Sequence, residues 1–384
     1  MRKLASVRQV STLMPIEGAD RIELALVDGW QCVVKKGEFM EGDFCVYFEV
    51  DSILPASAPW AEFMKERKYR VKTAKFRKAL SQGLALPLHT FHNYGLTDWE
   101  PLGKDVTELL GVTKHDPEGD KERRQAISSK SQKPWWAKTY LGGKLWDLLH
   151  PRRGGWPEWL RKTDETRIQN IVGLDRMMVG SQWYCTEKLD GQSITVYYNR
   201  EVKTGLFSKG AGGVCSRNIH YPKPVNNDWW AWALKNGILE RLKVYCEEHK
   251  VSLALQGELV GPGIRDNKYR FPEQNVFVFN VWDINKQEYL PLHEKIAVID
   301  ALNLIHVPML TELTRIINDV VETKVWKGAS ELREFILGMA EGYSKVAWFS
   351  KDAILSEGIV IRKLDDDGVS FKAISNIWLL KYES

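Results

Sequence analysis

Turn residues divide the first 112 residues into short apolar or alternating runs, and this pattern limits the fold of that region. The runs cover residues 4–10, 21–27, 30–35 and 44–50, with glycine-containing turns between them. Several short strands at close spacing are typical of a β-sandwich or a β-barrel. We therefore expect an N-terminal β domain, and a five-stranded OB-type barrel is the natural candidate at this length.

The chain changes character twice after this region. Residues 114–133 are charged and hold almost no apolar residues, which is typical of a linker or an exposed insertion. From residue 162 the pattern is mixed. Strands are expected at 193–198, 253–260 and 276–284, helices at 229–248 and 331–341, and a hairpin at 359–363 and 369–374. The expected fold class is α+β. Its parts are an OB-like domain (1–113), a charged, Trp-rich connector (114–161) and a domain of antiparallel sheets flanked by helices (162–384).

Composition excludes few classes of function. The net charge of +4 is too small to establish a nucleic-acid partner by itself. Five scattered cysteines lack any C-x-x-C pair or zinc spacing, which favours reduced thiols over a disulfide framework. No apolar run reaches membrane-spanning length, and the N-terminus lacks the apolar segment of a signal peptide. We expect a cytoplasmic or nucleoplasmic protein that is not secreted and has no membrane partner.

Two local clusters each allow two interpretations. Residues 65–78 hold eight basic side chains and one acid, interleaved with Tyr69 and Phe76. Such a stretch suits a phosphate backbone with bases beside it, or it is only a solvated loop. The second cluster is a group of tryptophans, for which packing of an irregular connector is favoured over base stacking. Its members are Trp135, Trp136, Trp146, Trp156 and Trp159.

The segment Thr-Glu-Lys-Leu-Asp-Gly-Gln-Ser at 186–193 contains the pattern Lys188-x-Asp190-Gly191. This pattern is the signature of a lysine that attacks a nucleoside triphosphate. An ordinary lysine is about one part in a thousand neutral near pH 7.5, so a nucleophilic lysine needs nearby cations that disfavour its protonated form. Asp190 would point to the same side of an extended segment and could hold the ammonium or metal-bound water. A surface lysine in a Leu-Asp-Gly turn is the alternative.

Four further segments follow in order, and each has an ordinary structural alternative. Arg217 in Ser-Arg-Asn could pair with phosphate, and Glu258 before Gly-Pro-Gly could reach ribose or hydrated Mg²⁺. Alternation over 276–284 places Trp282 on one face with Asn280, where its ring could meet a base, and makes Phe277 and Phe279 core residues. The hairpin sets Lys372 roughly opposite 360–362 and near Glu357, so an acid for a metal and a lysine for a phosphate could meet.

Together the segments EKLDG, SRN, GELVGPG, VWDI, EGIVIR and FKAIS resemble the covalent nucleotidyltransferase superfamily of ligases and RNA-capping enzymes. GELVGPG points to the RNA ligases. The upstream segments GDFCVYFEVDSILP, SQGLALPL and KTDETRIQN are similar to the Deinococcus-type RNA ligases, the fifth RNA-ligase family, which carry an OB domain ahead of the catalytic domain. The resemblance covers most of the chain outside 114–160. It implies ATP as AMP donor, Mg²⁺ or Mn²⁺, and RNA repair.

The resemblance also implies roles for individual residues. Lys188 would form lysyl-AMP, and Asp190, Glu258 and Glu357 would hold the metal through water. Arg217 would contact phosphate, Trp282 would stack on adenine, and Lys372 would bind the α-phosphate. The remaining nucleotide- or RNA-binding residues that it implies are Glu187, Gly191, Asn218, Arg167, Gln169 and Asn170. The implied partner is a nicked RNA duplex or broken RNA ends, with an RNA/DNA hybrid as an alternative and a monomeric enzyme favoured.

Two positions depart from the family pattern. The stacking position is tryptophan where phenylalanine is usual, and Ile374 stands where many relatives carry a second lysine, which Lys381 could replace. Two other functions stay open. A DNA ligase or capping guanylyltransferase usually carries its OB domain after the last motif, yet only twelve residues follow Lys372. A non-enzymatic OB-fold protein would be expected to have lost Lys188 or Glu357.

Overall fold

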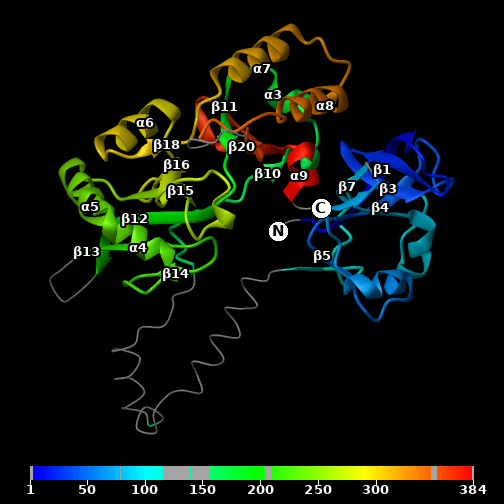
Figure 1. Cartoon of the computed structure of the whole chain (residues 1–384), viewed down its shortest axis with the longest axis horizontal. Coiled ribbons are helices and arrows are strands. Elements are labelled where there is room, and N and C mark those ends of the chain that lie inside the picture. The colour runs from blue at the N-terminus through cyan, green and yellow to red at the C-terminus, as the bar shows by residue number, and fades with distance from the viewer. Residues whose placement is uncertain are drawn as a thin grey trace.

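The structure is a computed structural model that describes residues 3–77, 79–115, 139, 156–203, 209–346 and 353–382. It contains an N-terminal β domain and a larger domain with two sheets, which lie side by side (Figure 1). The described helices include none with the length and apolar content needed for a membrane span. All five cysteines are buried and unpaired, as the sequence predicted.

The N-terminal domain is a barrel of five antiparallel strands in the order β3-β2-β1-β4-β8. These are β1 (Ala5–Pro15), β2 (Ile22–Val27), β3 (Trp30–Lys35), β4 (Phe44–Glu49) and β8 (Gly83–Pro87). The two edge strands are β3 and β8. The residues just before β8 bond to β3: Gln82 N donates to Gln31 O at 2.7 Å, and Val33 N donates to Ser81 Oγ at 3.1 Å. The predicted OB-type barrel is confirmed.

Short elements complete this domain. Two small antiparallel pairs join β5 (Ser52–Ile53) to β9 (Thr113–Lys114) and β6 (Ala74–Phe76) to β7 (Ala79–Ser81). Two 3-10 helices, η1 (Pro59–Arg67) and η2 (Leu88–Tyr94), cover one end of the barrel. Their rings pack on the barrel core, where Trp60 stacks on Phe48 with a centroid distance of 5.4 Å. Burial of such large rings is a main source of stability for a small barrel.

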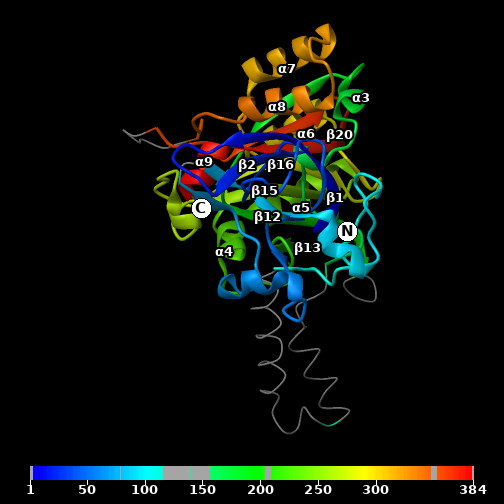
Figure 2. The same cartoon turned by 90° about the vertical axis from the view of Figure 1, so that its right-hand side faces the viewer.

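The larger domain has two sheets. The first has four strands in the order β10-β20-β19-β11, with β10 parallel to β20 and the other pairs antiparallel. Its strands are β10 (Thr166–Arg167), β20 (Asp366–Ile374), β19 (Gly358–Lys363) and β11 (Trp183–Lys188). Three helices pack against it through an apolar core, and they group together in both views (Figures 1 and 2). They are α3 (Leu174–Met178), α7 (Thr311–Thr323) and α8 (Ala329–Met339).

The second sheet has the order β14-β13-β12-β15-β16-β17, with β18 paired to β16. Its strands are β12 (Gln192–Lys203), β13 (Lys209–Cys215), β14 (His220–Tyr221), β15 (Leu253–Val260), β16 (Asn275–Asp283), β17 (Glu288–Tyr289) and β18 (Ile305–His306). Helices α4 (Asp228–Lys235), α5 (Ile238–His249) and α6 (Leu292–Ala301) cover one face. Short helices η4 (Ile168–Asn170) and η5 (Arg265–Asn267) and the C-terminal α9 (Asn376–Tyr382) lie outside the sheets.

The single helix expected over 229–248 is two helices. Gly237 adopts φ of +59° between α4 and α5, a conformation that interrupts an α-helix and that glycine tolerates. The other expected elements are present, with β15 at the predicted residues and α8 shifted by two. In the connector, residues 116–138 and 140–155 lie outside the described part, including Trp135, Trp136 and Trp146. Trp156 and Trp159 are described and pack beside Tyr197 and Leu160, which agrees with a packing role.

The barrel docks on the larger domain through a small apolar core and several polar contacts. Leu80 of the barrel packs with Ile374, Trp378 and Leu379. Gln82 Nε2 donates to Asn376 Oδ1 at 2.8 Å, next to this core. A buried apolar contact with an adjoining hydrogen bond fixes the relative position of two domains better than surface ion pairs do.

Candidate active site

A cavity of about 660 Å³ lies where the two sheets and the barrel meet. It collects residues that are far apart in sequence, and ten of the predicted site residues line it. These are Arg167, Glu187, Lys188, Asp190, Gly191, Arg217, Asn218, Glu258, Glu357 and Lys372. Three predicted residues, Gln169, Asn170 and Trp282, do not line it.

Lys188 is the last residue of β11 and pairs with Gly358 at the start of β19. This register brings the neighbouring Glu357 to Lys188, whose Nζ donates to Glu357 Oε2 at 2.6 Å. Burial acts to lower the pKa of Lys188, but the carboxylates of Glu357, Glu258 and Asp190 outweigh it and raise the pKa. The lysine is therefore held as an ammonium by its acidic neighbours.

Glu258 lies on β15 and lines the same cavity as Glu357. Its Oε1 accepts a hydrogen bond from Gly191 N at 3.0 Å. Burial raises the pKa of Glu258 to about 7, with Lys188 opposing this shift. Position 191 requires glycine because its backbone lies close to β15: a Cβ there would lie 2.3 Å from Leu259 O. Gly191 thus lies at a bend of the chain and at a close approach to β15.

Asp190 is held by a basic residue that the sequence analysis missed. Lys268 Nζ forms a hydrogen-bonded ion pair with Asp190 Oδ2, and Arg265 lies 3.8 Å from the other oxygen. The Lys268 ammonium also lies 4.7 Å from the ring centroid of Trp378 on α9, a cation–π distance. The signal that could have found Lys268 is the basic run at 265–270, directly after the Gly-Pro-Gly turn.

Lys372 and Arg167 stand side by side because β10 and β20 pair in parallel at these two residues. Burial, with help from Lys188 and Arg167, lowers the pKa of Lys372 to about 7. Lys381, which the sequence offered as a replacement for the missing second lysine, is exposed and does not line the cavity. The structure places Arg167 beside Lys372 instead.

The cavity rim carries Arg217 and Asn218. Arg217 Nη2 donates to Asp164 Oδ1 at 2.5 Å, and the Arg217 side chain is half exposed. Glu187 lines the inner wall, where its Oε2 accepts a hydrogen bond from Lys345 N at 2.8 Å. Burial raises the pKa of Glu187. The rim residues are thus accessible to a large ligand, whereas Glu187 is fixed by the loop that contacts it.

The prediction that Trp282 faces the site is wrong. Between Gln256 and Gly257 of β15 the pairing of β16 shifts from Asn280 to Val278, so Phe279 is an extra residue in a β-bulge. The bulge adds Phe279 to the face of β16 that carries Asn280. Trp282 stays on that face but pairs with Ala254, farther along β15 from Glu258, and so misses the cavity. Phe279 lines the cavity, and the Phe279 assignment to the core is corrected. Trp282 packs beside Tyr289, and its Nε1 donates to Trp159 O at 3.0 Å.

Gln169 and Asn170 belong to the domain interface and not to the cavity. Asn170 Nδ2 donates to Glu49 Oε1 of the barrel at 2.5 Å, and Arg8 Nη2 donates to Asn170 Oδ1 at 3.1 Å. Gln169 is buried, and its carbonyl accepts from Arg8 Nη1. The predicted ligand contacts of this pair are therefore corrected to domain docking, because η4 turns both side chains toward the barrel.

The basic stretch at 65–78 contributes only part of its charge to the cavity. Arg70 and Lys72 line it, together with Lys114 and His115 from the end of the barrel domain. Lys65 pairs with Glu62 elsewhere, and Lys78 lies outside the described part. The barrel thus presents several cations across the cavity from Lys188.

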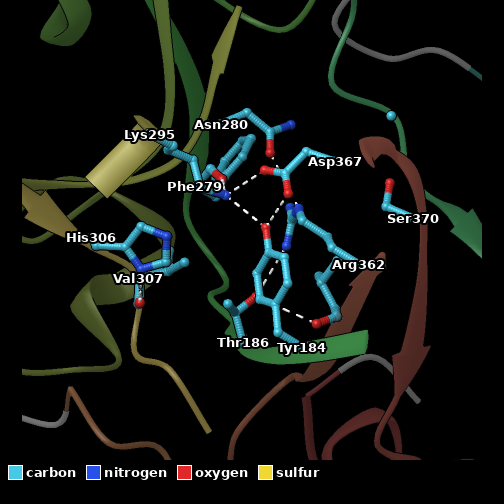
Figure 3. Close-up of polar contacts among 12 residues, drawn as sticks. Tyr184, Thr186, Phe279, Asn280, Lys295, His306, Val307, Arg362, Asp367 and Ser370 are labelled. Atoms are coloured by element: carbon cyan, nitrogen blue, oxygen red, sulfur yellow. Dashed lines mark hydrogen bonds and ion pairs between the residues drawn. The ribbon is translucent and has the colours of Figure 1, made fainter. Parts of the chain in front are cut away.

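The sequence analysis missed a buried polar network that forms part of the inner wall, through Arg362, Thr186 and Glu165, and extends behind it (Figure 3). Arg362 on β19 donates to Thr186 Oγ1 at 3.1 Å and to Glu165 Oε1 at 3.0 Å. Lys295 on α6 forms an ion pair with Asp367 on β20, and both side chains are fully buried. Burial lowers the pKa of Lys295 to about 8, with Asp367 opposing. Arg and Lys are almost never buried unless paired, so both are strongly constrained.

Comparison with known proteins agrees with this geometry. The RNA ligase family model matches residues 181–374, and an OB-fold domain model matches residues 4–88. A comparison with curated protein sequences finds no match.

Solved structures of Naegleria gruberi RNA ligase match the whole length of the chain. The form with PPi has 32% identity and a TM-score of 0.72, covering 100% of this chain and 99% of that one. A lysine-to-methionine variant with AMP and Mn has 31% identity and a TM-score of 0.73, covering 99% of each chain. A variant with ATP and Mn has 32% identity and a TM-score of 0.71, covering 99% of each chain. The chain therefore belongs to the RNA ligase family, in the Deinococcus-type arrangement with an OB domain ahead of the nucleotidyltransferase domain.

Proposed function

We propose that this chain is an ATP-dependent RNA ligase that joins a 3′-hydroxyl to a 5′-phosphate through lysyl-AMP on Lys188. The observation that carries the proposal is the charge arrangement of the cavity. Lys188 has Glu258 and Glu357 on one side, and Lys372 with Arg167 lie in the same cavity. Carboxylates beside the lysine suit a metal ion, and cations in the same cavity suit the phosphates, so this arrangement suits attack of Lys188 on a triphosphate.

The carboxylates fit a hydrated divalent cation. Carboxylate oxygens are the donors that Mg²⁺ and Mn²⁺ prefer, and Mg²⁺ usually keeps several water ligands. Within the described ranges no three His, Cys, Asp or Glu side chains form a direct metal cluster, so Asp190, Glu258 and Glu357 would act through water. A bound cation supplies positive charge that offsets the carboxylates and so favours the neutral form of Lys188. Relatives of this chain were solved with ATP and Mn.

Three displacements at phosphorus follow. The Lys188 nitrogen forms a bond to the α-phosphorus of ATP as the bond to the pyrophosphate oxygen breaks. The RNA 5′-phosphate then takes AMP from the lysine, and the RNA 3′-hydroxyl displaces AMP to form the phosphodiester. Lys372 and Arg167 stabilise negative charge on the α-phosphate in each step.

The remaining wall residues divide between the base and the RNA. Phe279, Val307 and Val360 form an apolar part of the cavity that suits the adenine ring. Arg217 and Asn218 on the rim suit the phosphate of an RNA end. Arg70 and Lys72 of the barrel suit the backbone of the RNA strand. A monomer that acts on nicked RNA duplexes, or on RNA/DNA hybrids, is consistent with these surfaces.

The first test is covalent labelling with α-labelled ATP and Mg²⁺. We expect protein-bound label on the wild-type protein that is stable to alkali and released by hot acid, as for a phosphoramidate bond, and no label on Lys188→Ala. Lys36→Ala, which removes an exposed barrel lysine away from the cavity, is the control and should label like wild type. Absence of label on wild type, or equal label on Lys188→Ala, would exclude the proposed function.

The second test sets the polynucleotide. Nicked duplexes that carry ribose or deoxyribose on each side of the nick should show that sealing needs a ribonucleotide at the 3′-hydroxyl. Comparable sealing of all-DNA nicks would instead identify a DNA ligase.

A further inference from the structure

The bulge in β16 places the backbone of Phe279 outside the regular strand pairing. Phe279 is the extra residue, so it has no pairing partner in β15, unlike Val278 and Asn280 on either side of it. A buried carbonyl without a donor is costly, and a regular strand would avoid that cost. Regular pairing, however, would shift one arm of β16 by one residue and reverse which side chains face the cavity. Something must therefore stabilise the bulge.

Lys295 donates a hydrogen bond to the carbonyl of this extra residue. Its Nζ donates to Phe279 O at 3.0 Å, to Tyr184 Oη at 2.7 Å and to Asp367 Oδ2 at 2.5 Å. These three bonds use all three donors of the ammonium. Figure 3 shows the ammonium between Phe279, Asp367 and Tyr184.

The other two partners come from the first sheet. Tyr184 is on β11 and Asp367 is on β20, and the Tyr184 hydroxyl donates to Asp367 Oδ1 at 2.5 Å. Asp367 thus accepts from both Lys295 and Tyr184, while Lys295 comes from α6 on the second sheet. The ammonium is anchored on the first sheet and reaches a single carbonyl in the second sheet. It fixes that carbonyl relative to β11, the strand that ends in Lys188.

We propose that Lys295 is a positioning residue for nucleotide binding. Its ammonium holds the carbonyl of Phe279 and thereby keeps the Phe279 ring in the cavity, where the ring packs on the base of ATP. The inference rests on the proposed function, since it requires that the cavity binds ATP. Lys295 itself does not line the cavity, so it acts only through Phe279.

The test separates positioning from folding by the choice of variants. Lys295→Met alone leaves the buried Asp367 unpaired, and breaking such a pair is strongly destabilising. Lys295→Met with Asp367→Asn removes both charges and keeps the volume, so it preserves the fold. Asp367→Asn alone is the matched control. Burial already lowers the pKa of Lys295 and Asp367 opposes this, so without the carboxylate the lysine is buried as a neutral amine that still donates to the Phe279 carbonyl. Thermal unfolding verifies the fold of each variant.

The readout is the lysine adenylylation reaction in both directions. The double variant should raise KM for ATP about tenfold, as expected for loss of one base-stacking contact. Its kcat at saturating ATP should stay within about twofold of wild type, because the reacting groups are unchanged. KM for pyrophosphate in the reverse reaction should not change, because pyrophosphate carries no base. Asp367→Asn should have a KM for ATP close to wild type.

A mutant cycle tests whether Lys295 acts through Phe279. Phe279→Leu should raise KM for ATP by itself, and adding the double variant to it should raise KM little further. Additive effects would overturn the inference. A wild-type KM for ATP in the folded double variant, or an equal rise in KM for pyrophosphate, would overturn it too. Failure of wild type to label would exclude the proposed function instead, so the two failures are distinguishable.

Discussion

The acidic neighbours of Lys188 set the protonation state of its side chain. Glu357, Glu258 and Asp190 raise the pKa of Lys188, which keeps the nucleophile protonated. The same residue types were predicted from the sequence, because their motifs are short and local. The sequence did not reveal that Lys268 would hold Asp190, since these residues are 78 positions apart and meet only through the turn after β15.

Lys372 gives the first prediction at this scale. Lys372→Ala should lower the rate of lysine adenylylation about a hundredfold, as expected when one preorganised group that stabilises developing charge is lost. Lys381→Ala is the matched control and should keep the wild-type rate, because Lys381 is exposed and outside the cavity. Single-turnover labelling with ATP measures both rates. A larger loss in Lys381→Ala would mean that Lys381 supplies the second phosphate contact.

His306 gives a prediction for pH. Burial, with a contribution from Lys295, lowers the pKa of His306 from 6.5 to about 4, and its Nε2 has no hydrogen-bond partner in the described part. Between pH 6.5 and 4 the unfolded chain binds a proton here that the folded chain does not, so the free energy of unfolding falls as pH falls. This group contributes about 3 kcal/mol to that loss.

His306→Gln should lose less stability than wild type over that pH window, because the variant has no imidazole to protonate in the unfolded state. Urea unfolding at pH 7 and pH 4.5 measures the difference. The other titrating groups are common to both proteins and cancel. An equal loss in both would show that His306 is readily protonated in the folded state.

At the scale of elements, the regular strands were predictable and their irregularities were not. Alternating residues gave β15 at the residues observed, because its pairing to β12 is regular. In β16 the same alternation assigned Phe279 to the core, and the bulge places it on the cavity side instead. Trp282 keeps the face that carries Glu258 but lies farther along the sheet, beside Ala254 and outside the cavity. A bulge depends on what the neighbouring elements supply, here the ammonium of Lys295 from α6. No local pattern encodes that contact.

The reversed assignment can be tested directly. Trp282→Phe should leave KM for ATP unchanged, because the indole lies outside the cavity. It should lower the free energy of unfolding by about 1 kcal/mol, because the carbonyl of Trp159 loses one of its two donors and keeps Gln287 Nε2. Phe279→Leu should instead raise KM for ATP. ATP–pyrophosphate exchange and urea unfolding measure these quantities, and a raised KM in Trp282→Phe would restore the sequence-based assignment.

At the scale of the whole molecule, docking of the barrel decides the shape of the site. Leu80 and Gln82 contact α9, and Arg8 and Glu49 contact Asn170. This docking directs Arg70 and Lys72 toward the cavity that contains Lys188. The sequence left residues 65–78 undecided between an RNA surface and a solvated loop, because their direction depends on the position of the other domain.

Lys72→Ala should weaken binding and sealing of nicked RNA while leaving lysyl-AMP formation unchanged. If Lys72 contacts one phosphate, the slope of log affinity against log salt should fall by about 1. Lys36→Ala, on the same barrel but outside the cavity, is the control. Binding measured between low and moderate salt gives the slopes, and an unchanged slope in Lys72→Ala would remove this lysine from the RNA surface.

The sequence by itself indicated the barrel, the order of the two domains and the lysine that we propose as the nucleophile. These depend on local periodicity, on turns and on short motifs in which a few neighbouring residues carry the chemistry. Only the tertiary structure decided which aromatic ring faces the cavity, which cation stands beside Lys372, and that Gln169 and Asn170 dock the barrel. The physical reason is that each of these depends on strand register or domain contact between residues far apart in the chain. Burial of paired charges such as Lys295 and Asp367 then stabilises one such arrangement over its alternatives.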